Sequence, residues 1–315
     1  MAEYKGIKGF NIQTVSSDPA NPLIGEVWYN STSGTVKYFG VQAEAWSTGG
    51  NLGTGKDMLV GAGTQTASLA FGGSSTGNSF LTEEYNGSAW TAGGNMATTR
   101  SRIAGAGTQT AGLAFGGYIG PPNSAATEEY NGTAWTAGGN MGTARRELPG
   151  AGTQTAGLGI GGYTTTNVVT TEEYDGSAWT AGGNLGTARA YSAAGGTQTA
   201  GLVFGGNPLT AATEEYNGTA WTAGGNLGTA TYLLAGAGTQ TAGLVFGGQR
   251  PTVTAATEKY DGTSWTATVS MSIARGQLGG AGTQAAALGF GGGGTLTATE
   301  EFNGETPATF TVGTD

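Results

Sequence analysis

The composition of this 315-residue chain excludes several classes of protein. Its 63 Gly argue against a helical fold, because glycine costs about 1 kcal/mol in a helix interior, and its 10% charged and 9% aromatic residues argue against disorder. The formal net charge of −9 disfavours nucleic-acid binding, and the absence of His and Cys excludes disulfides, thiolate chemistry and the commonest metal ligands. A Gly-, Thr- and Ala-rich β protein remains.

The first residues of the chain, 1–24, are predicted to form an extended arm or anchor. Met1 to Phe10 contains Lys5 and Lys8 but no apolar stretch as long as that of a signal peptide, so we expect no signal peptide. No apolar run approaches the ~18 residues of a membrane span, so none is expected. Residues 25–315 are predicted to form the main domain.

From about residue 50 onwards the sequence repeats itself. Each copy contains Thr-Gln-Thr (Thr-Gln-Ala in the last), an apolar run ending in Gly-Gly, a run such as Thr-Glu-Glu-Tyr, a turn of Asn-Gly or Asp-Gly and, in most copies, Trp. The six glutamines are spaced at intervals of 44, 45, 44, 42 and 44 residues and are Gln65, Gln109, Gln154, Gln198, Gln240 and Gln284. A period of this length without a helical stripe is typical of β-propeller blades.

One copy is predicted to contain four short antiparallel strands. In the second copy these are residues 102–107, 111–117 and 127–130, and a strand that begins near Trp135. Asn131-Gly132, between the third and fourth strands, is a strong hairpin signal because both residues tolerate positive φ. The predicted fold class is therefore all-β, a closed β-propeller of four-stranded antiparallel blades.

Both ends of the chain are predicted to take part in closing the ring. Residues 25–39 and 45–51 resemble the later strands of a repeat, whereas the last copy lacks a Trp after Asn303-Gly304. A closed ring leaves no exposed strand edges, so N-terminal strands should pair with C-terminal ones in a composite blade. Six repeats plus this blade give seven blades, the number we expect; six result if the N-terminal strands complete the last repeat.

Two repeated features are interpreted mainly as packing. The Gly-Gly pair after each apolar run, such as Gly116-Gly117, permits unusual φ and close backbone approach where blades crowd together. One Trp recurs at a fixed position in five copies, which is typical of a core between blades, although a row of sugar-binding platforms is an alternative. These residues are Trp90, Trp135, Trp179, Trp221 and Trp265.

The variable segments of the repeat are predicted to lie on one face of the propeller. Antiparallel strands place the similar Thr-Gln-Thr and Asn-Gly turns on one face, and the loops after the second and fourth strands on the other. Binding residues concentrate in variable loops on a rigid scaffold. The candidate binding residues on this loop face are Lys56, Arg100, Tyr118, Arg145, Arg189, Arg250 and Arg275.

Five of these candidates occupy one position in successive copies, and Thr231 takes that position in the fifth copy. A ring of positive charge there would suit an acidic glycan or a carboxylate-rich partner. Alternatively, each basic residue pairs with a glutamate on the third strand of its own or the next blade. Recurrence in nearly every copy favours this structural interpretation.

The repeated glutamates are not expected to form a catalytic or metal site. Glu83 and Glu84 are adjacent in a strand, so their side chains point to opposite faces. A glycosidase needs its carboxylates within about 10 Å of each other, across one substrate. We therefore predict no enzyme activity, no metal and no cofactor. The Asn-Gly-Ser and Asn-Gly-Thr sequences, which match the glycosylation pattern, are interpreted as turns.

Over roughly residues 50–310 the repeat resembles the kelch family of β-propellers. The shared features are the double Gly after an apolar run, the Tyr of the third strand, the Trp that follows it and the Arg between blades. The resemblance implies four strands per blade and partner binding rather than a particular activity. Kelch-like copper-radical oxidases need His ligands and a Tyr–Cys cross-link, and this chain has neither His nor Cys.

The opening of the chain, above all residues 25–39 (GEVWYNSTSGTVKYF), is similar to an N-terminal module of tailed-phage tail-fibre and structural proteins. The similarity implies a non-enzymatic virion protein, assembled in the host cytoplasm, that docks to other virion proteins through its N-terminal segment. Its propeller face would bind a host surface glycan or protein. The alternative is a cellular carbohydrate- or protein-binding kelch propeller.

Overall fold

A computed structural model describes residues 12–312 of the protein. The regular structure of these residues consists of 28 β-strands, and none of them forms a helix that could cross a membrane. The strands divide between two compact units, residues 45–303 and a smaller unit of residues 1–44 with 304–315. The boundaries therefore lie at residues 44 and 304, whereas the sequence analysis placed one after residue 24.

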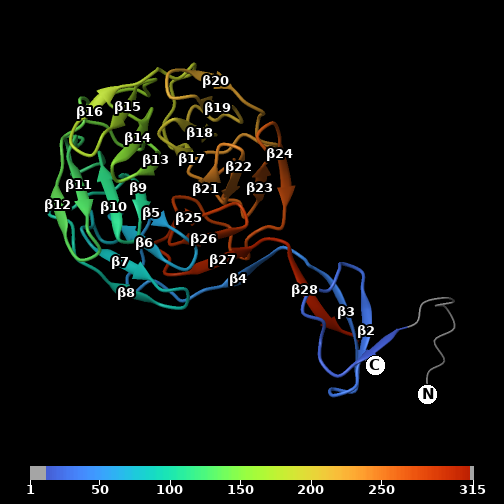
Figure 1. The fold of residues 1–315 in the computed structure, drawn as a ribbon. Coiled ribbons are helices and arrows are strands. Elements are labelled where there is room, and N and C mark those ends of the chain that lie inside the picture. Colours follow the sequence, from blue (N-terminus) through green and yellow to red (C-terminus); the bar gives the residue numbers. More distant parts are fainter. Residues whose placement is uncertain (1–11, 313–315) are drawn as a thin grey trace. The chain divides into compact units, whose positions relative to one another are not determined.

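The larger unit contains six four-stranded antiparallel sheets, each with one strand near the centre of the ring and one at its rim (Figure 1). The predicted pattern of strands in one repeat is confirmed. The first three blades are β5 (Val60–Gly63), β6 (Ser68–Phe71), β7 (Thr82–Tyr85) and β8 (Trp90–Ala92); β9 (Ala104–Thr108), β10 (Ala111–Phe115), β11 (Thr127–Tyr130) and β12 (Trp135–Ala137); and β13 (Gly150–Thr153), β14 (Ala156–Ile160), β15 (Thr171–Tyr174) and β16 (Trp179–Ala181).

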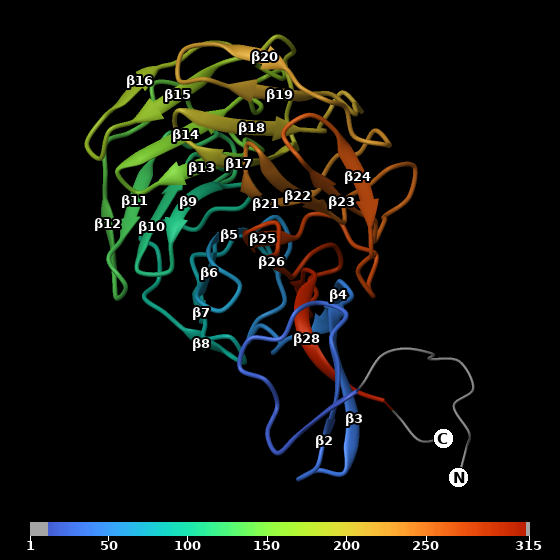
Figure 2. The same ribbon diagram turned by 45° about the vertical axis from the view of Figure 1, so that its right-hand side comes forward.

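The fourth and fifth blades repeat this order, and the fourth is seen from the centre to the rim in Figure 2. They are β17 (Ala193–Thr197), β18 (Ala200–Phe204), β19 (Thr213–Tyr216) and β20 (Trp221–Ala223); and β21 (Ala235–Thr239), β22 (Ala242–Phe246), β23 (Thr257–Tyr260) and β24 (Trp265–Thr268). The strands are short, and second strands such as β18 and β22 are buried at nearly every residue because each sheet packs against its neighbours on both faces.

The sixth blade combines both ends of the repeat region. Its three inner strands are β25 (Gly279–Gly282), β26 (Ala286–Phe290) and β27 (Thr299–Asn303), and its outer strand is β4 (Ala45–Thr48), which pairs with β27. Trp46 of β4 lies opposite Phe302 and supplies the Trp that the sixth sequence copy lacks. The predicted pairing of N-terminal with C-terminal strands is confirmed here.

Contacts between blades run around the ring without a gap. The inner strands of neighbouring blades contact one another, and β25 of the sixth blade contacts β5 of the first. In each blade the outer-strand Trp donates its indole N–H to a Thr at the start of the third strand of the preceding blade. Trp135 donates to Thr82 at 2.9 Å, and across the closing interface Trp90 donates to Thr299 at the same distance.

The smaller unit holds the seventh four-stranded sheet that the sequence predicts. It consists of β1 (Gln13–Val15), β2 (Val27–Asn30), β3 (Thr35–Gln42) and β28 (Thr306–Thr311), with β1 parallel to β2 and the other pairs antiparallel. Of the seven sheets, six thus belong to the unit 45–303. The predicted arm, residues 1–24, falls partly outside the described residues, and its residues 13–15 form β1.

The core lies between blades, as the repeated Trp and Phe predict. Phe71 and Phe115 are fully buried, and Phe71 packs against Trp135 of the next blade with ring centroids 4.9 Å apart. The glycine pair is needed at this point, because Gly116 has φ +65° and a Cβ there would lie 2.7 Å from the carbonyl oxygen of Arg145. The interpretation of the Trp residues as core is confirmed.

Candidate functional site

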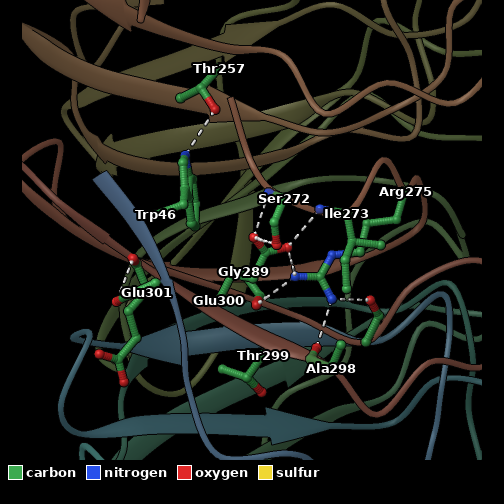
Figure 3. Close-up of polar contacts among 12 residues, drawn as sticks. Trp46, Thr257, Ser272, Ile273, Arg275, Gly289, Ala298, Thr299, Glu300 and Glu301 are labelled. Carbon is green, nitrogen blue, oxygen red and sulfur yellow. Dashed lines mark hydrogen bonds and ion pairs between the residues drawn. The ribbon is translucent and has the colours of Figure 1, made fainter. Parts of the chain in front are cut away.

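The five repeated basic candidates are buried in ion pairs within their own blades. Arg100, Arg145 and Arg189 are 0% exposed, as is Lys56, and Arg275 is 1% exposed. Each pairs with the first glutamate of the third strand, as in the 2.9 Å contact of Arg145 with Glu172 and the contact of Arg275 with Glu300 in Figure 3. The structural interpretation of this position is confirmed, and the alternative of a charged ring open to a ligand is wrong because these side chains do not reach the surface.

In the fifth blade, the basic partner of the first glutamate comes from another position of the repeat. Thr231 stands at the basic position, and Arg250, from the loop between β22 and β23, donates to its hydroxyl at 3.0 Å. The guanidinium of Arg250 also lies 3.5 Å from Glu258, the first glutamate of that blade. Arg250, a predicted binding residue, therefore takes over the ion pair that the missing basic residue leaves open.

The second glutamate of each pair accepts a hydrogen bond from a tyrosine of the next blade. The phenol of Tyr130 donates to Glu84 of the preceding blade at 2.5 Å, and burial together with this bond raises the pKa of Tyr130 to about 12. Where the sixth blade has Phe302 in place of Tyr, the position of the accepting glutamate holds Lys259. Glu83 and Glu84 thus have separate partners, and residues 12–312 contain no group of three or more acidic residues placed to hold a metal ion.

Two residues after each buried basic position, the backbone adopts a left-handed conformation. The six residues have φ between 52° and 60°, and each donates its backbone N–H to the carbonyl of its counterpart in the preceding blade, as Arg102 does to Met58 at 3.0 Å. The six bonds form a closed cycle around the axis of the ring. The residues of this axial ring are Met58, Arg102, Glu147, Tyr191, Leu233 and Gln277.

No two residues of the axial ring are alike, although they share one backbone conformation. A side chain in the left-handed region costs about 1–2 kcal/mol, and this chain uses glycine at many other positions with positive φ. Strained positions of this kind are found at ligand sites, where the surrounding structure holds them. The axial ring and the residues next to it line a cavity of about 100 Å³.

Charged and aromatic side chains gather on the side of the axial ring formed by the second and third blades. Glu147, 2% exposed, accepts from Arg102 at 2.6 Å and from Arg146 at 3.2 Å. The guanidinium of Arg146 lies over the rings of Tyr118 and Tyr163, 4.9 and 4.7 Å from their centroids. Such contacts are favourable because the ring face is electron-rich.

Two further titratable groups face this cluster. Burial, with a hydrogen bond to Glu147, raises the pKa of Tyr191 to about 12, so the phenol stays neutral and donates. Burial also raises the pKa of Asp57, and the positive charge of Arg102 partly opposes this shift. The two side chains form no ion pair in the described structure. Arg146, the second cation of the cluster, lies over the ring of Tyr163 of the third blade.

Arg146 also borders a groove between the second and third blades. The volume of this groove is about 420 Å³. The groove is lined by Tyr118, Pro121, Pro122, Asn123, Ala144, Arg146, Thr164 and Thr165. No carboxylate is among these residues, so the guanidinium is the charged group that a ligand in the groove would meet.

Sequence reasoning found one member of this site and missed the others. Tyr118 was predicted and lies here, whereas the buried basic residues and Arg250 serve the fold. Arg102, Arg146 and Glu147 were missed because they lie one or two residues after the repeated basic position, which drew attention by its regularity. The signal was in the sequence, since these are the positions at which otherwise similar copies differ. No protein-family model and no curated protein matches the chain.

Proposed function

We propose that the protein is a non-enzymatic component of a phage particle, a structural or fibre-type protein whose propeller loop face binds a glycan or a protein. The similarity of residues 25–39 to an N-terminal module of phage tail proteins supports the place of action, with the N-terminal segment docking to other virion proteins. The kelch-like repeat supports binding rather than catalysis. In this proposal the propeller is a scaffold that carries a binding site on its loop face, next to the axis of the ring.

The observation that carries the binding role is the contrast within the axial ring. Its six residues occupy equivalent positions with the same φ and the same hydrogen bond, and their side chains are all different. An architectural position varies little, as the buried basic position shows with four Arg and one Lys in six copies. A rigid frame that presents different side chains at one point is what a ligand site requires.

The arrangement of ionisable groups supports a non-enzymatic role. The repeated glutamates accept hydrogen bonds from arginines, backbone amides or tyrosines of the frame, as Glu172 does from Arg145 and from the amide of Gly142. Glu147 at the axis is held by Arg102 and Arg146. The same oxygen of this carboxylate is therefore already engaged by two donors of the protein.

The test is whether the protein is part of the particle. We expect immunoblots and mass spectrometry of gradient-purified particles to detect it at a constant ratio to the major capsid protein, and immunogold labelling to place it on one part of the particle. An abundant host protein followed through the same gradient gives the background. Finding the protein only in the soluble fraction of infected cells would overturn the virion role and favour the cellular binding propeller.

A further inference from the structure

We propose that the groove between the second and third blades binds the carboxylate of an acidic saccharide, with Arg146 as the residue that contacts the carboxylate. The proposal rests on the proposed binding function of the loop face and names the ligand class and the place. The groove lies in a chain of formal net charge −9, and Arg146 is, with Arg102 and Arg250, one of the arginines of residues 12–312 whose side chains stay partly exposed.

The charge on Arg146 is only partly neutralised by the protein. Among residues 12–312, Glu147 is the single ion-pair partner of Arg146, and the same carboxylate oxygen accepts from Arg102 at 2.6 Å, against 3.2 Å from Arg146. The remaining bond of Arg146 is to the amide oxygen of Asn123 at 3.0 Å. Its Nη2 contacts no acceptor among residues 12–312, and its side chain is 22% exposed.

Arg146 is also held in place before any ligand arrives. Its guanidinium lies over Tyr118 and Tyr163, while Nε and Nη1 are fixed by Glu147 and Asn123. Asn123 in turn donates to the carbonyls of Tyr163 and Thr164 at 3.1 Å, which ties the two loops together. Preorganisation of this kind lowers the entropy cost of binding, and Nη2 can donate a charge-assisted hydrogen bond to a carboxylate of the ligand.

The tyrosines of the propeller lie in two places. Residues 45–303 contain nine, of which five lie on the third strands in the core. The other four are Tyr118, Tyr163, Tyr191 and Tyr232, and all are partly exposed residues of the loop face. Their distribution does not follow the repeat, so packing of the blades does not explain it.

The rest of the groove suits a sugar ring. Tyr118, Pro121 and Pro122 offer flat apolar surfaces, and Thr164 and Thr165 offer hydroxyl groups. A saccharide presents apolar C–H patches and hydroxyls side by side, which complements such a mixed lining. The volume of about 420 Å³ falls in the range of small-ligand sites, about 300–1,000 Å³, rather than that of a surface for a folded partner.

The experiment measures binding of defined oligosaccharides to the purified full-length protein by isothermal titration calorimetry. The probes are an α-1,4-linked galacturonate hexamer, an α-2,8-linked N-acetylneuraminate trimer, the methyl esters of both, and a hexaglutamate peptide. We expect at least one acidic saccharide to bind and its ester to bind about tenfold or more weakly, because the ester loses the charge-assisted bonds.

Two variants and a charge control test the residue. Arg146→Gln should lower the affinity about tenfold or more. Arg146→Lys should restore little of it, because a single ammonium cannot keep the bonds to Glu147 and Asn123 and also donate to the ligand. Lys259→Gln removes one positive charge from β23 of the fifth blade and should leave binding unchanged. Circular dichroism spectra like that of the unmodified protein show that each variant is folded.

Several results would overturn the proposal. These are equal binding of acid and ester, binding of hexaglutamate as tight as that of the saccharides, loss of binding in Lys259→Gln to the same extent as in Arg146→Gln, or no binding of either acidic saccharide. The virion role is tested on particles and this ligand on purified protein, so either can fail while the other stands.

Discussion

Arg145 and Arg146 are neighbours in the chain, and they belong to two different regions of the propeller. Arg145 lies in the frame of its own blade, 0% exposed, and its contacts recur around the ring. Arg146 lies at the axial end, partly exposed, where each blade has a different residue. The difference teaches that identity between copies reports packing in this protein, whereas variation on an identical backbone is the basis of the binding role that we propose.

The largest expected effect comes from removing a buried cation of the frame. Arg145→Ala leaves the carboxylate of Glu172 buried without its partner, so we expect the free energy of unfolding to fall by about 3–5 kcal/mol. Chemical denaturation followed by circular dichroism measures the change.

Arg146→Gln is the matched control, since the same residue type is replaced one position along the chain. We expect a loss of about 1 kcal/mol or less, because Glu147 keeps its contact with Arg102. Equal losses in Arg145→Ala and Arg146→Gln would break the distinction between the frame and the axial end.

A smaller effect is expected at the closing strand. Trp46 is half-buried between Phe246 and Phe302 and donates to Thr257 at 3.1 Å (Figure 3). Trp46→Ala should destabilise the propeller by about 3 kcal/mol through lost packing and a lost hydrogen bond. Thr48→Ala, at an exposed position of the same strand, is the control. An unchanged denaturation midpoint in Trp46→Ala would show that β4 does not close the ring.

The smallest effect at neutral pH is expected from the bonds between Tyr and Glu of neighbouring blades. Tyr130→Phe removes one of them and should cost about 1 kcal/mol. Folding raises the pKa of these phenols from 10.0 to about 12 in Tyr85, Tyr130, Tyr174 and Tyr260, so the folded state favours the protonated form.

The stabilisation that these phenols provide is therefore complete below pH 10 and is lost as the pH rises through 12. Denaturation midpoints measured across this interval should fall more steeply in the unmodified protein than in Tyr130→Phe. A parallel decline of the midpoints in both proteins would show that alkaline unfolding does not depend on the contact between Tyr130 and Glu84.

The repeat in the sequence was enough to predict much of the fold. The strands, the turns and the core Trp follow from local pattern, because strand alternation and turn chemistry are properties of neighbouring residues. The pairing of the two chain ends was predicted instead from the incomplete last copy and from the need to leave no strand edge exposed. The pairing of Arg with a third-strand glutamate of its own or the next blade was predicted because the residues recur in the copies, and the structure shows that the partner belongs to the same blade. Tyr118 was predicted on the loop face, where it lies.

Tertiary structure alone decided which variable residues meet and how the sheets divide between units. Met58 and Gln277 are far apart in the chain and become hydrogen-bonded neighbours only when the ring closes. The left-handed backbone of the axial ring arises from that closure and not from the residues there, none of which is glycine. Arg146 gains its tyrosines and its groove from two loops that only the packing of adjacent blades brings together. Contacts between distant segments depend on the global arrangement, which local preferences do not encode.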